Sequence, residues 1–122
     1  MIIYRDPRDV AGSSLLMVRS FNQPLVRFYN TAEKVSGQLV RAIECMEQHA
    51  DKVHSILYER LVSQPEVEIN KLSVLLGVDA SGLSLDLVHN KSIGKYTCGI
   101  RQDELATVIE ICGTTMSRLG YS

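Results

Sequence analysis

The pattern of apolar and polar residues near the start of the chain predicts a strand followed directly by a helix. The apolar run Ile2–Tyr4 is short and ends at charged residues, which is typical of a buried strand. Asp6 is a good N-cap, and Pro7 suits the first helical position because an N–H is not needed there. The apolar positions that follow predict a helix that runs to about Ser20.

The middle of the chain repeats this alternation. A break is expected at Asn22-Gln23-Pro24, and a long helix over about 24–51 follows from apolar positions that recur every three or four residues: Val35, Leu39, Ile43 and Met46. The second apolar run, residues 53–58, predicts another strand. Residues 59–65 predict a turn or short helix, and residues 65–76 a helix with Gly77 at its C-cap.

The last third of the chain predicts an irregular stretch over residues 79–100 and an amphipathic helix over about 102–119 that ends at Gly120. The resulting order is β-α-α-β-α-loop-α. Strands separated by helices indicate an α/β fold with a parallel sheet. Because parallel sheets normally have several strands covered on both faces, two strands predict a sheet that is incomplete.

Composition excludes several classes of protein. The chain has 122 residues, 45% of them hydrophobic and 22% charged, which allows one ordinary globular domain. Its net charge of −1 does not favour nucleic acid or an anionic membrane as a partner. No apolar stretch approaches the ~20 residues that a membrane-spanning helix needs, and no signal-peptide pattern is present.

Cysteines and histidines do not predict a metal site. Cys45, Cys98 and Cys112 form no C-x-x-C pair, and the three histidines lack partners at ligand spacing. We expect reduced thiols, with Cys45 and Cys112 packed on helix faces. Reduced thiols suit the cytoplasm, although a Golgi anchor upstream of residue 1 would change that localisation.

The end of the first predicted strand carries the chemistry of an anion site. Arg5 leaves the carboxyl edge of the strand, where α/β sheets bind ligands, and a capped helix begins at once. An arginine there can make a two-pronged contact with phosphate. Ser13 lies two helical turns further on and could join if the ligand lies along the helix. The alternative is that Arg5 pairs with a carboxylate and Ser13 is a small packing residue.

This segment resembles a known motif. The run Arg5-Asp6-Pro7-Arg8-Asp9-Val10, with Ser13 eight residues after the arginine, is similar to the 3′-phosphate-binding motif of sulfotransferases. Those enzymes use 3′-phosphoadenosine 5′-phosphosulfate (PAPS). The resemblance implies that Arg5 and Ser13 bind the 3′-phosphate. Arg8 and Asp9 also match the pattern, and we expect them to be structural and to form surface or helix-start pairs.

A second match follows in the family's order. Tyr58-Glu59-Arg60-Leu61 resembles the Tyr-Glu-Asp-Leu segment that closes a central strand in sulfotransferases, with Arg60 in place of the aspartate. The resemblance implies that Tyr58 contacts the adenine, and the alternative is a strand-end tyrosine packed on a helix. Residues 75–78 also resemble the Leu-Leu-Gly segment that comes next in the family.

A third match lies in the irregular stretch. Residues 91–96 resemble the late loop that covers the 3′ end of the cofactor. This implies that Lys91 or Lys95 meets the 3′-phosphate and that Gly94 lets the backbone come close. The alternative is a pair of solvated surface lysines. Tyr96 stands where bacterial relatives often have tryptophan, and the Arg-Lys-Gly pattern of the phenol and steroid branch is missing.

The resemblance therefore implies a partial P-loop-NTPase-like sulfotransferase fold, with residues 1–122 as the C-terminal portion of one domain. The complete protein would transfer a sulfuryl group from PAPS to a hydroxyl or amine. The glycine-rich 5′-phosphosulfate loop and the catalytic base of the family would precede Arg5, so we assign no catalytic residue and expect this chain alone to be inactive. Gly113-Thr114-Thr115 has the letters of that loop but lies in a predicted helix.

Two other functions stay open on the sequence. The chain could be a non-catalytic nucleotide-binding or interaction module whose open sheet edge docks a partner chain. It could also belong to another α/β nucleotide-binding class such as the kinases. The acceptor substrate cannot be read from these residues.

Overall fold

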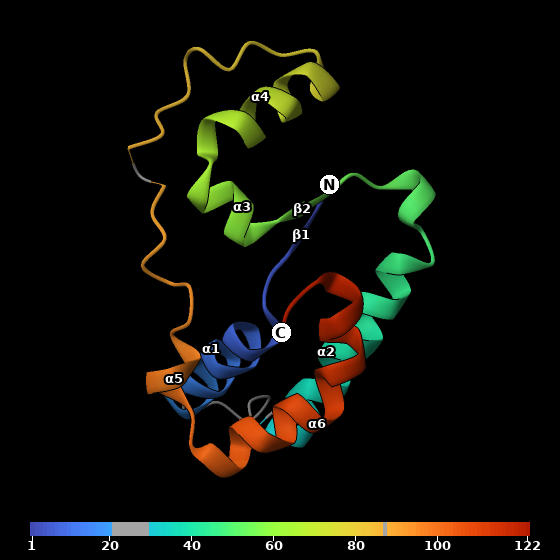
Figure 1. Cartoon of the computed structure of the whole chain (residues 1–122), viewed down its shortest axis with the longest axis vertical. Helices are drawn as coiled ribbons and strands as arrows, with labels where there is room; N and C mark the ends of the chain where they lie inside the picture. Colours follow the sequence, from blue (N-terminus) through green and yellow to red (C-terminus); the bar gives the residue numbers. More distant parts are fainter. Residues whose placement is uncertain (21–29, 87) are drawn as a thin grey trace.

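The computed structural model describes residues 1–20, 30–86 and 88–122, and helices dominate this part of the chain (Figure 1). The elements in chain order are β1 (Ile2–Tyr4), α1 (Pro7–Ser20), α2 (Ala32–Glu47), the short 3₁₀ helix η2 (Ala50–Lys52), β2 (Ser55–Leu57), α3 (Tyr58–Ser63), α4 (Pro65–Leu76), α5 (Tyr96–Gly99) and α6 (Gln102–Leu119). Most bounds agree with the sequence pattern, including the ends of α1, α4 and α6 and the position of residues 113–115 inside α6.

The two strands form a small parallel sheet in the middle of the molecule. Ile2 lies opposite Ser55, and Tyr4 lies opposite Leu57. This confirms the expected parallel pairing and an α/β arrangement at the level of a two-stranded sheet. The expected burial of the first strand is wrong: Ile3 is 48% exposed, whereas Ile56 beside it is 4% exposed. An apolar strand is buried only where a layer covers it, and none of the described segments covers Ile3.

The core lies below the sheet, where α1, α2 and α6 pack together (Figure 1). Apolar residues spaced three or four apart face one another there, as the helical period requires. The buried members of this cluster are Ala11, Leu15, Ala32, Val35, Val108, Cys112 and Met116. This core holds α1 in place, and α1 carries the predicted anion-binding serine.

The second helix is shorter than predicted. It begins at Ala32, because the Thr31 hydroxyl caps it by accepting from the Lys34 N–H. It ends at Glu47, and η2 replaces the last predicted turn. Residues 21–29, which contain the expected break and the predicted start of this helix, lie outside the described residues.

Cys45 is exposed rather than packed on a helix face, whereas Cys112 is buried as expected.

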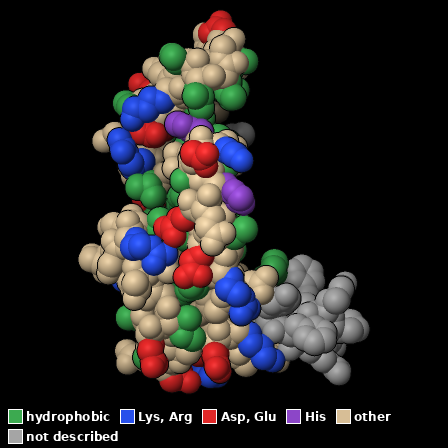
Figure 2. All heavy atoms as spheres, turned by 90° about the vertical axis from the view of Figure 1, so that its right-hand side faces the viewer, with side chains coloured by type: hydrophobic (Ala, Val, Ile, Leu, Met, Phe, Trp, Pro, Cys, Tyr) green, Lys and Arg blue, Asp and Glu red, His purple; other side chains and the backbone are tan. Residues whose placement is uncertain are grey.

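The end of the molecule formed by α4 exposes apolar side chains, which Figure 2 shows as hydrophobic atoms at the top of the view. Val74 is 84% exposed, and the other apolar residues of this region with large exposed fractions are Val67, Leu75, Leu76, Val78 and Leu83. On the rest of that face, basic and acidic side chains are interspersed. Over the three described ranges, no helix is both long and apolar enough to cross a membrane.

An ion pair fixes the start of α6, and because of it we expect the folded state to lose stability at acid pH. Glu104 is buried, pairs with Arg19 of α1, and accepts from the backbone N–H of Arg101 at 3.0 Å. The hydrogen bond from Arg19, first, and the Arg101 contacts hold the pKa of Glu104 below its ordinary value, against the effect of burial. Because the folded carboxylate takes up a proton less readily than the unfolded one, this stability is present above the unfolded pKa and is lost as pH falls through the folded pKa.

We therefore expect Glu104→Gln to lower the free energy of unfolding by about 1–2 kcal/mol at neutral pH and by less at acid pH. Urea denaturation at a series of pH values measures this. Glu110→Gln, at an exposed position of the same helix, is the matched control and should leave the pH dependence unchanged. Parallel pH profiles for the Glu104 variant and the wild type would contradict the prediction.

Candidate functional site

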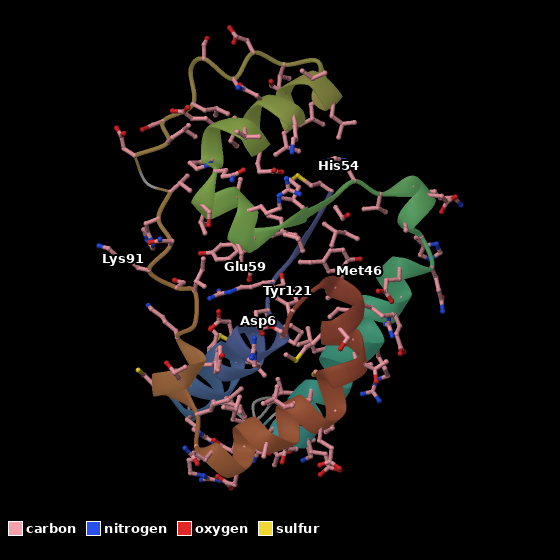
Figure 3. The ribbon with its side chains drawn as sticks, viewed as in Figure 1. Asp6, Met46, His54, Glu59, Lys91 and Tyr121 are labelled. Carbon is pink, nitrogen blue, oxygen red and sulfur yellow. The ribbon has the colours of Figure 1, made fainter. Side chains whose placement is uncertain are left out.

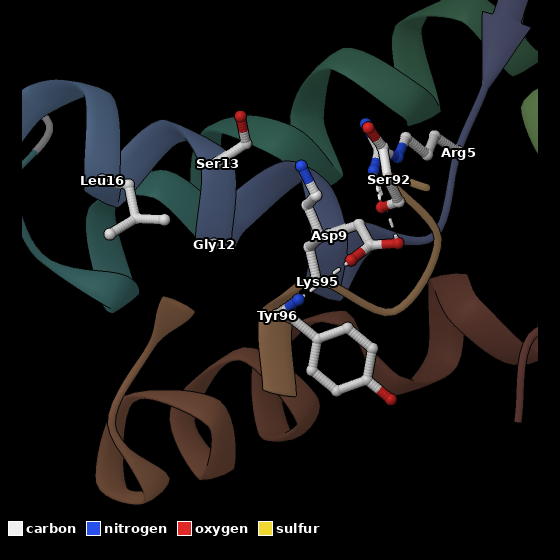
Figure 4. Close-up of a pocket in the computed structure, with 8 residues that line it drawn as sticks. All are labelled: Arg5, Asp9, Gly12, Ser13, Leu16, Ser92, Lys95 and Tyr96. Atoms are coloured by element: carbon white, nitrogen blue, oxygen red, sulfur yellow. Dashed lines mark hydrogen bonds and ion pairs between the residues drawn. The ribbon is translucent and has the colours of Figure 1, made fainter. Parts of the chain in front are cut away.

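A pocket of about 240 Å³ lies between α1 and the loop that precedes α5 (Figure 4). Its polar lining comes from the residue after β1, the first two turns of α1, the loop and the first residue of α5: Arg5, Asp9, Ser13, Ser92, Lys95 and Tyr96. Three of these, Arg5, Ser13 and Lys95, are residues that the sequence predicted to bind phosphate. The fold thus brings together residues that are up to ninety positions apart in the chain.

The helical period explains why α1 can line the pocket. Gly12 and Ser13 lie three and four residues after Asp9, and Leu16 lies four and three residues after them, so all four share one face of the helix. Gly12 has no side chain, which allows α5 to approach closely: a Cβ at that position would lie 3.4 Å from the Cβ of Tyr96. In Figure 4 the side chains of Ser13 and Lys95 point the same way, opposite to the ring of Tyr96.

Arg5 is held on three sides. Its Nη2 donates to the carbonyl oxygen of Ser92 and lies 3.5 Å from an oxygen of Asp9. Its guanidinium lies over the ring of Tyr58, 4.6 Å from the ring centroid. The Nε atom is buried and has no hydrogen-bond partner among the described residues. The hydrogen bond and the ion pair named above both use Nη2, so other N–H donors of the guanidinium are left for an anionic acceptor.

Asp9 fastens the loop to α1. Its side chain is 1% exposed, and its two oxygens accept from the backbone N–H groups of Gly94, at 2.8 Å, and Tyr96, at 3.1 Å. Gly94 adopts a φ of +73°, which residues with a side chain rarely do, and this turn presents both N–H groups to one carboxylate. The expectation that Asp9 has a structural role fits its place in the structure, but the side chain is buried, and its hydrogen-bond donors are Gly94 of the loop and Tyr96 at the start of α5.

The other predicted site residues lie around this pocket rather than in it. Tyr58 is the first residue of α3, and its ring faces Arg5. The Gly94 N–H is directed at Asp9. Lys91 is exposed, and Figure 3 shows it pointing away from the body of the molecule. Lys95 is also exposed, but it lines the pocket.

Pairs at the start of α1 keep the arginine motif in place. Arg8 makes a two-pronged contact with Asp6, with Nη2 2.7 Å from Oδ2, and its guanidinium lies over the ring of Tyr96. Asp6 also accepts from the N–H of Arg8, so it caps the helix as predicted. Arg60, which replaces the family's aspartate, lies 3.4 Å from the buried Glu68 and links α3 to α4.

Two features of the site were missed by sequence reasoning. Ser92 contributes a backbone carbonyl, which no side-chain pattern reveals. Glu59 accepts from the N–H of Asp6 at 3.0 Å and so fixes the peptide that follows Arg5. The signal for Glu59 was present, because it stands next to Tyr58 in the segment that resembles the family.

The charges of the pocket favour an anion. Arg5 and Lys95 are cationic, and the single carboxylate of the lining, Asp9, is already occupied by two N–H groups and Arg5. Among the described residues, no group of three or more histidine, cysteine, aspartate or glutamate side chains is arranged to hold a metal ion. The arrangement can therefore bind a phosphate or sulfate group through cations and a hydroxyl.

A comparison with known protein families gives a match over most of the chain. A family model described as "Sulfotransferase family" matches residues 1–82 of the 122, which include Arg5, Ser13 and Tyr58 and exclude the loop with Lys91, Gly94 and Lys95. No significant match is found among curated proteins or among solved structures. Because the matched range covers more than half of the sequence and contains the strand-arginine-helix segment, the chain belongs to the sulfotransferase family.

Proposed function

We propose that the pocket binds the 3′-phosphate of PAPS, the sulfuryl donor. The observation that carries this proposal is the convergence of Arg5, Ser13 and Lys95 on one pocket at the carboxyl end of a parallel strand. Arg5 and Lys95 would neutralise the phosphate, and the Ser13 hydroxyl would donate one hydrogen bond to it. Phosphate bound in this way would lie along the first two turns of α1.

The partners of Arg5 explain how it could accept this ligand without unfolding the site. Nη2 is engaged by Ser92 and Asp9, and Tyr58 covers the guanidinium plane. A guanidinium has five N–H donors in one plane, so phosphate oxygens could use the others. Asp9 would keep the guanidinium oriented while the phosphate binds. Tyr58 would then support the arginine, and contact with the adenine would be a second role for its ring.

The reaction of the complete protein would be transfer of the sulfuryl group to a hydroxyl or amine acceptor. Such transfer requires backbone N–H groups and a cation around the 5′-phosphosulfate. Among the described residues, no glycine-containing segment stands between a strand and a helix in the manner of that loop. Gly113-Thr114-Thr115, in particular, is inside α6. We therefore propose that these 122 residues hold the nucleotide but do not transfer the sulfuryl group by themselves.

Titration of the chain with 3′-phosphoadenosine 5′-phosphate (PAP), the product nucleotide, tests the proposal. We expect saturable binding by calorimetry and binding of AMP that is weaker by at least about tenfold, because the 3′-phosphate adds charge-assisted contacts. Circular dichroism beforehand establishes that the chain is folded. Equal affinity for the two nucleotides, or no binding of PAP by a folded chain, would contradict the proposal.

The small sheet favours a second candidate function, that of an interaction module. β1 and β2 pair with each other, and Ile3 in the middle of β1 is 48% exposed. Parallel sheets of two strands are rarely stable alone, so further strands from another segment or a partner chain would complete a P-loop-like sheet. A chain that folds only in the presence of such a partner, and binds no nucleotide when folded, would favour this function over the first.

A further inference from the structure

We propose that Tyr121 and Glu59 act as a positioning pair for the arginine site, so that a residue just after α6 controls nucleotide affinity. This inference rests on the proposed function of the pocket. Figure 3 shows Asp6, Glu59 and Tyr121 close together where β1 leads into α1. Neither Glu59 nor Tyr121 lines the pocket, so their effect on a ligand would pass through Arg5.

Glu59 bridges two segments that are far apart in the sequence. One carboxylate oxygen accepts from the backbone N–H of Asp6 at 3.0 Å, and the other accepts from the Tyr121 hydroxyl at 2.6 Å. The Asp6 N–H belongs to the peptide group that follows Arg5. Holding this peptide fixes the direction in which the Arg5 side chain leaves the strand.

The neighbour of Glu59 acts on the same arginine. Tyr58 covers the Arg5 guanidinium at 4.6 Å, so consecutive residues of α3 hold the side chain and the backbone of one residue. A shift of α3 would move both contacts together. The geometry of the guanidinium therefore depends on how firmly Glu59 is held.

Tyr121 is the residue that holds Glu59 from the core side. Its ring packs against the buried cluster of α1, α2 and α6, and its backbone N–H donates to the Met116 carbonyl at 2.9 Å. Burial, first, and the hydrogen bond to Glu59 raise the pKa of the Tyr121 phenol far above its ordinary value, so the hydroxyl stays protonated as a donor. The core is thus linked through one hydroxyl to the strand end that carries Arg5.

The test is the affinity of the Tyr121→Phe chain for PAP. Phenylalanine keeps the ring in the core and removes only the hydroxyl. We expect affinity to fall by about threefold to tenfold, the range that one hydrogen bond contributes, in a chain that circular dichroism shows to be folded at the temperature of the titration. Glu59→Gln, which keeps an acceptor for the Asp6 N–H, should lose less affinity than Glu59→Ala.

Arg118→Gln is the matched control. It breaks a contact of 2.8 Å between Arg118, in the last turn of α6, and Glu47, at the end of α2. It should leave PAP affinity unchanged.

The outcomes separate this inference from the function on which it rests. If the wild type does not prefer PAP to AMP, or Arg5→Ala has no effect, the proposed function fails and the inference fails with it. If Arg5→Ala weakens binding but Tyr121→Phe only lowers the unfolding midpoint, the pair is merely structural and the inference alone is overturned. Loss of affinity in Tyr121→Phe with Arg118→Gln unchanged supports it.

Discussion

Replacing Arg5 with alanine should lower the affinity of the chain for PAP by about 10-fold to 150-fold, while AMP binding changes little. The physical reason is that PAP carries a 3′-phosphate and AMP does not. Arg5 offers a charge-assisted contact from a part-buried position, and its Nε atom has no partner among the described residues. Hydrogen bonds to charged groups contribute about 1.5–3 kcal/mol each, which gives this range.

Two further variants sharpen the measurement. Arg5→Lys keeps the charge but loses the planar fork, so it should recover only part of the affinity. Arg60→Ala is the control, because Arg60 is an exposed arginine, paired with Glu68, outside the pocket. Equal losses for PAP and AMP in Arg5→Ala would contradict the 3′-phosphate assignment, and so would an equally large loss in Arg60→Ala. Calorimetry on all four chains decides this.

Local patterns predicted most of the elements of this fold. Gly77, Gly120 and the Asp6-Pro7 start each mark a helix end where the structure has one, because caps depend on residues within one turn. The burial of Ile2–Tyr4 was predicted wrongly, because an apolar run shows that a strand can be buried but not that a layer covers it. Periodicity alone could not identify the protein family, since two strands and several helices are common to many α/β proteins. The match to the family model identified it.

The candidate site was predictable to the extent that its residues are close in sequence or belong to a motif. Arg5 and Ser13 lie on one strand-helix unit, and the pocket contains both. The sequence could not show which of Lys91 and Lys95 lines the pocket, because their positions depend on a turn that Asp9 holds from 85 positions away. Contacts made by backbone atoms, such as the Ser92 carbonyl, have no side-chain signature.

The turn at Gly94 is held by the Asp9 carboxylate, and replacing this carboxylate has the second large expected effect. Asp9→Asn should lower the free energy of unfolding by about 3 kcal/mol and weaken PAP binding as well. An asparagine can accept through one oxygen only, so one of the Gly94 and Tyr96 N–H groups would face an amide nitrogen. The charge that faces Arg5 would also be lost. For a domain whose total stability is about 5–15 kcal/mol, this is a large fraction.

Urea denaturation measures the loss of stability, and amide hydrogen exchange at Gly94 and Tyr96 shows whether the loop is released from α1. Asp103→Asn is the matched control: Asp103 also pairs with an arginine, Arg101, but its side chain is 71% exposed, so solvent screens the pair and stability should barely change. Faster exchange at both amides together with weaker PAP binding would mean that the loop must be closed for the nucleotide to bind. Faster exchange with unchanged affinity would instead place the whole phosphate contact on the strand-helix unit of Arg5 and Ser13, and Lys95 would then be a surface lysine.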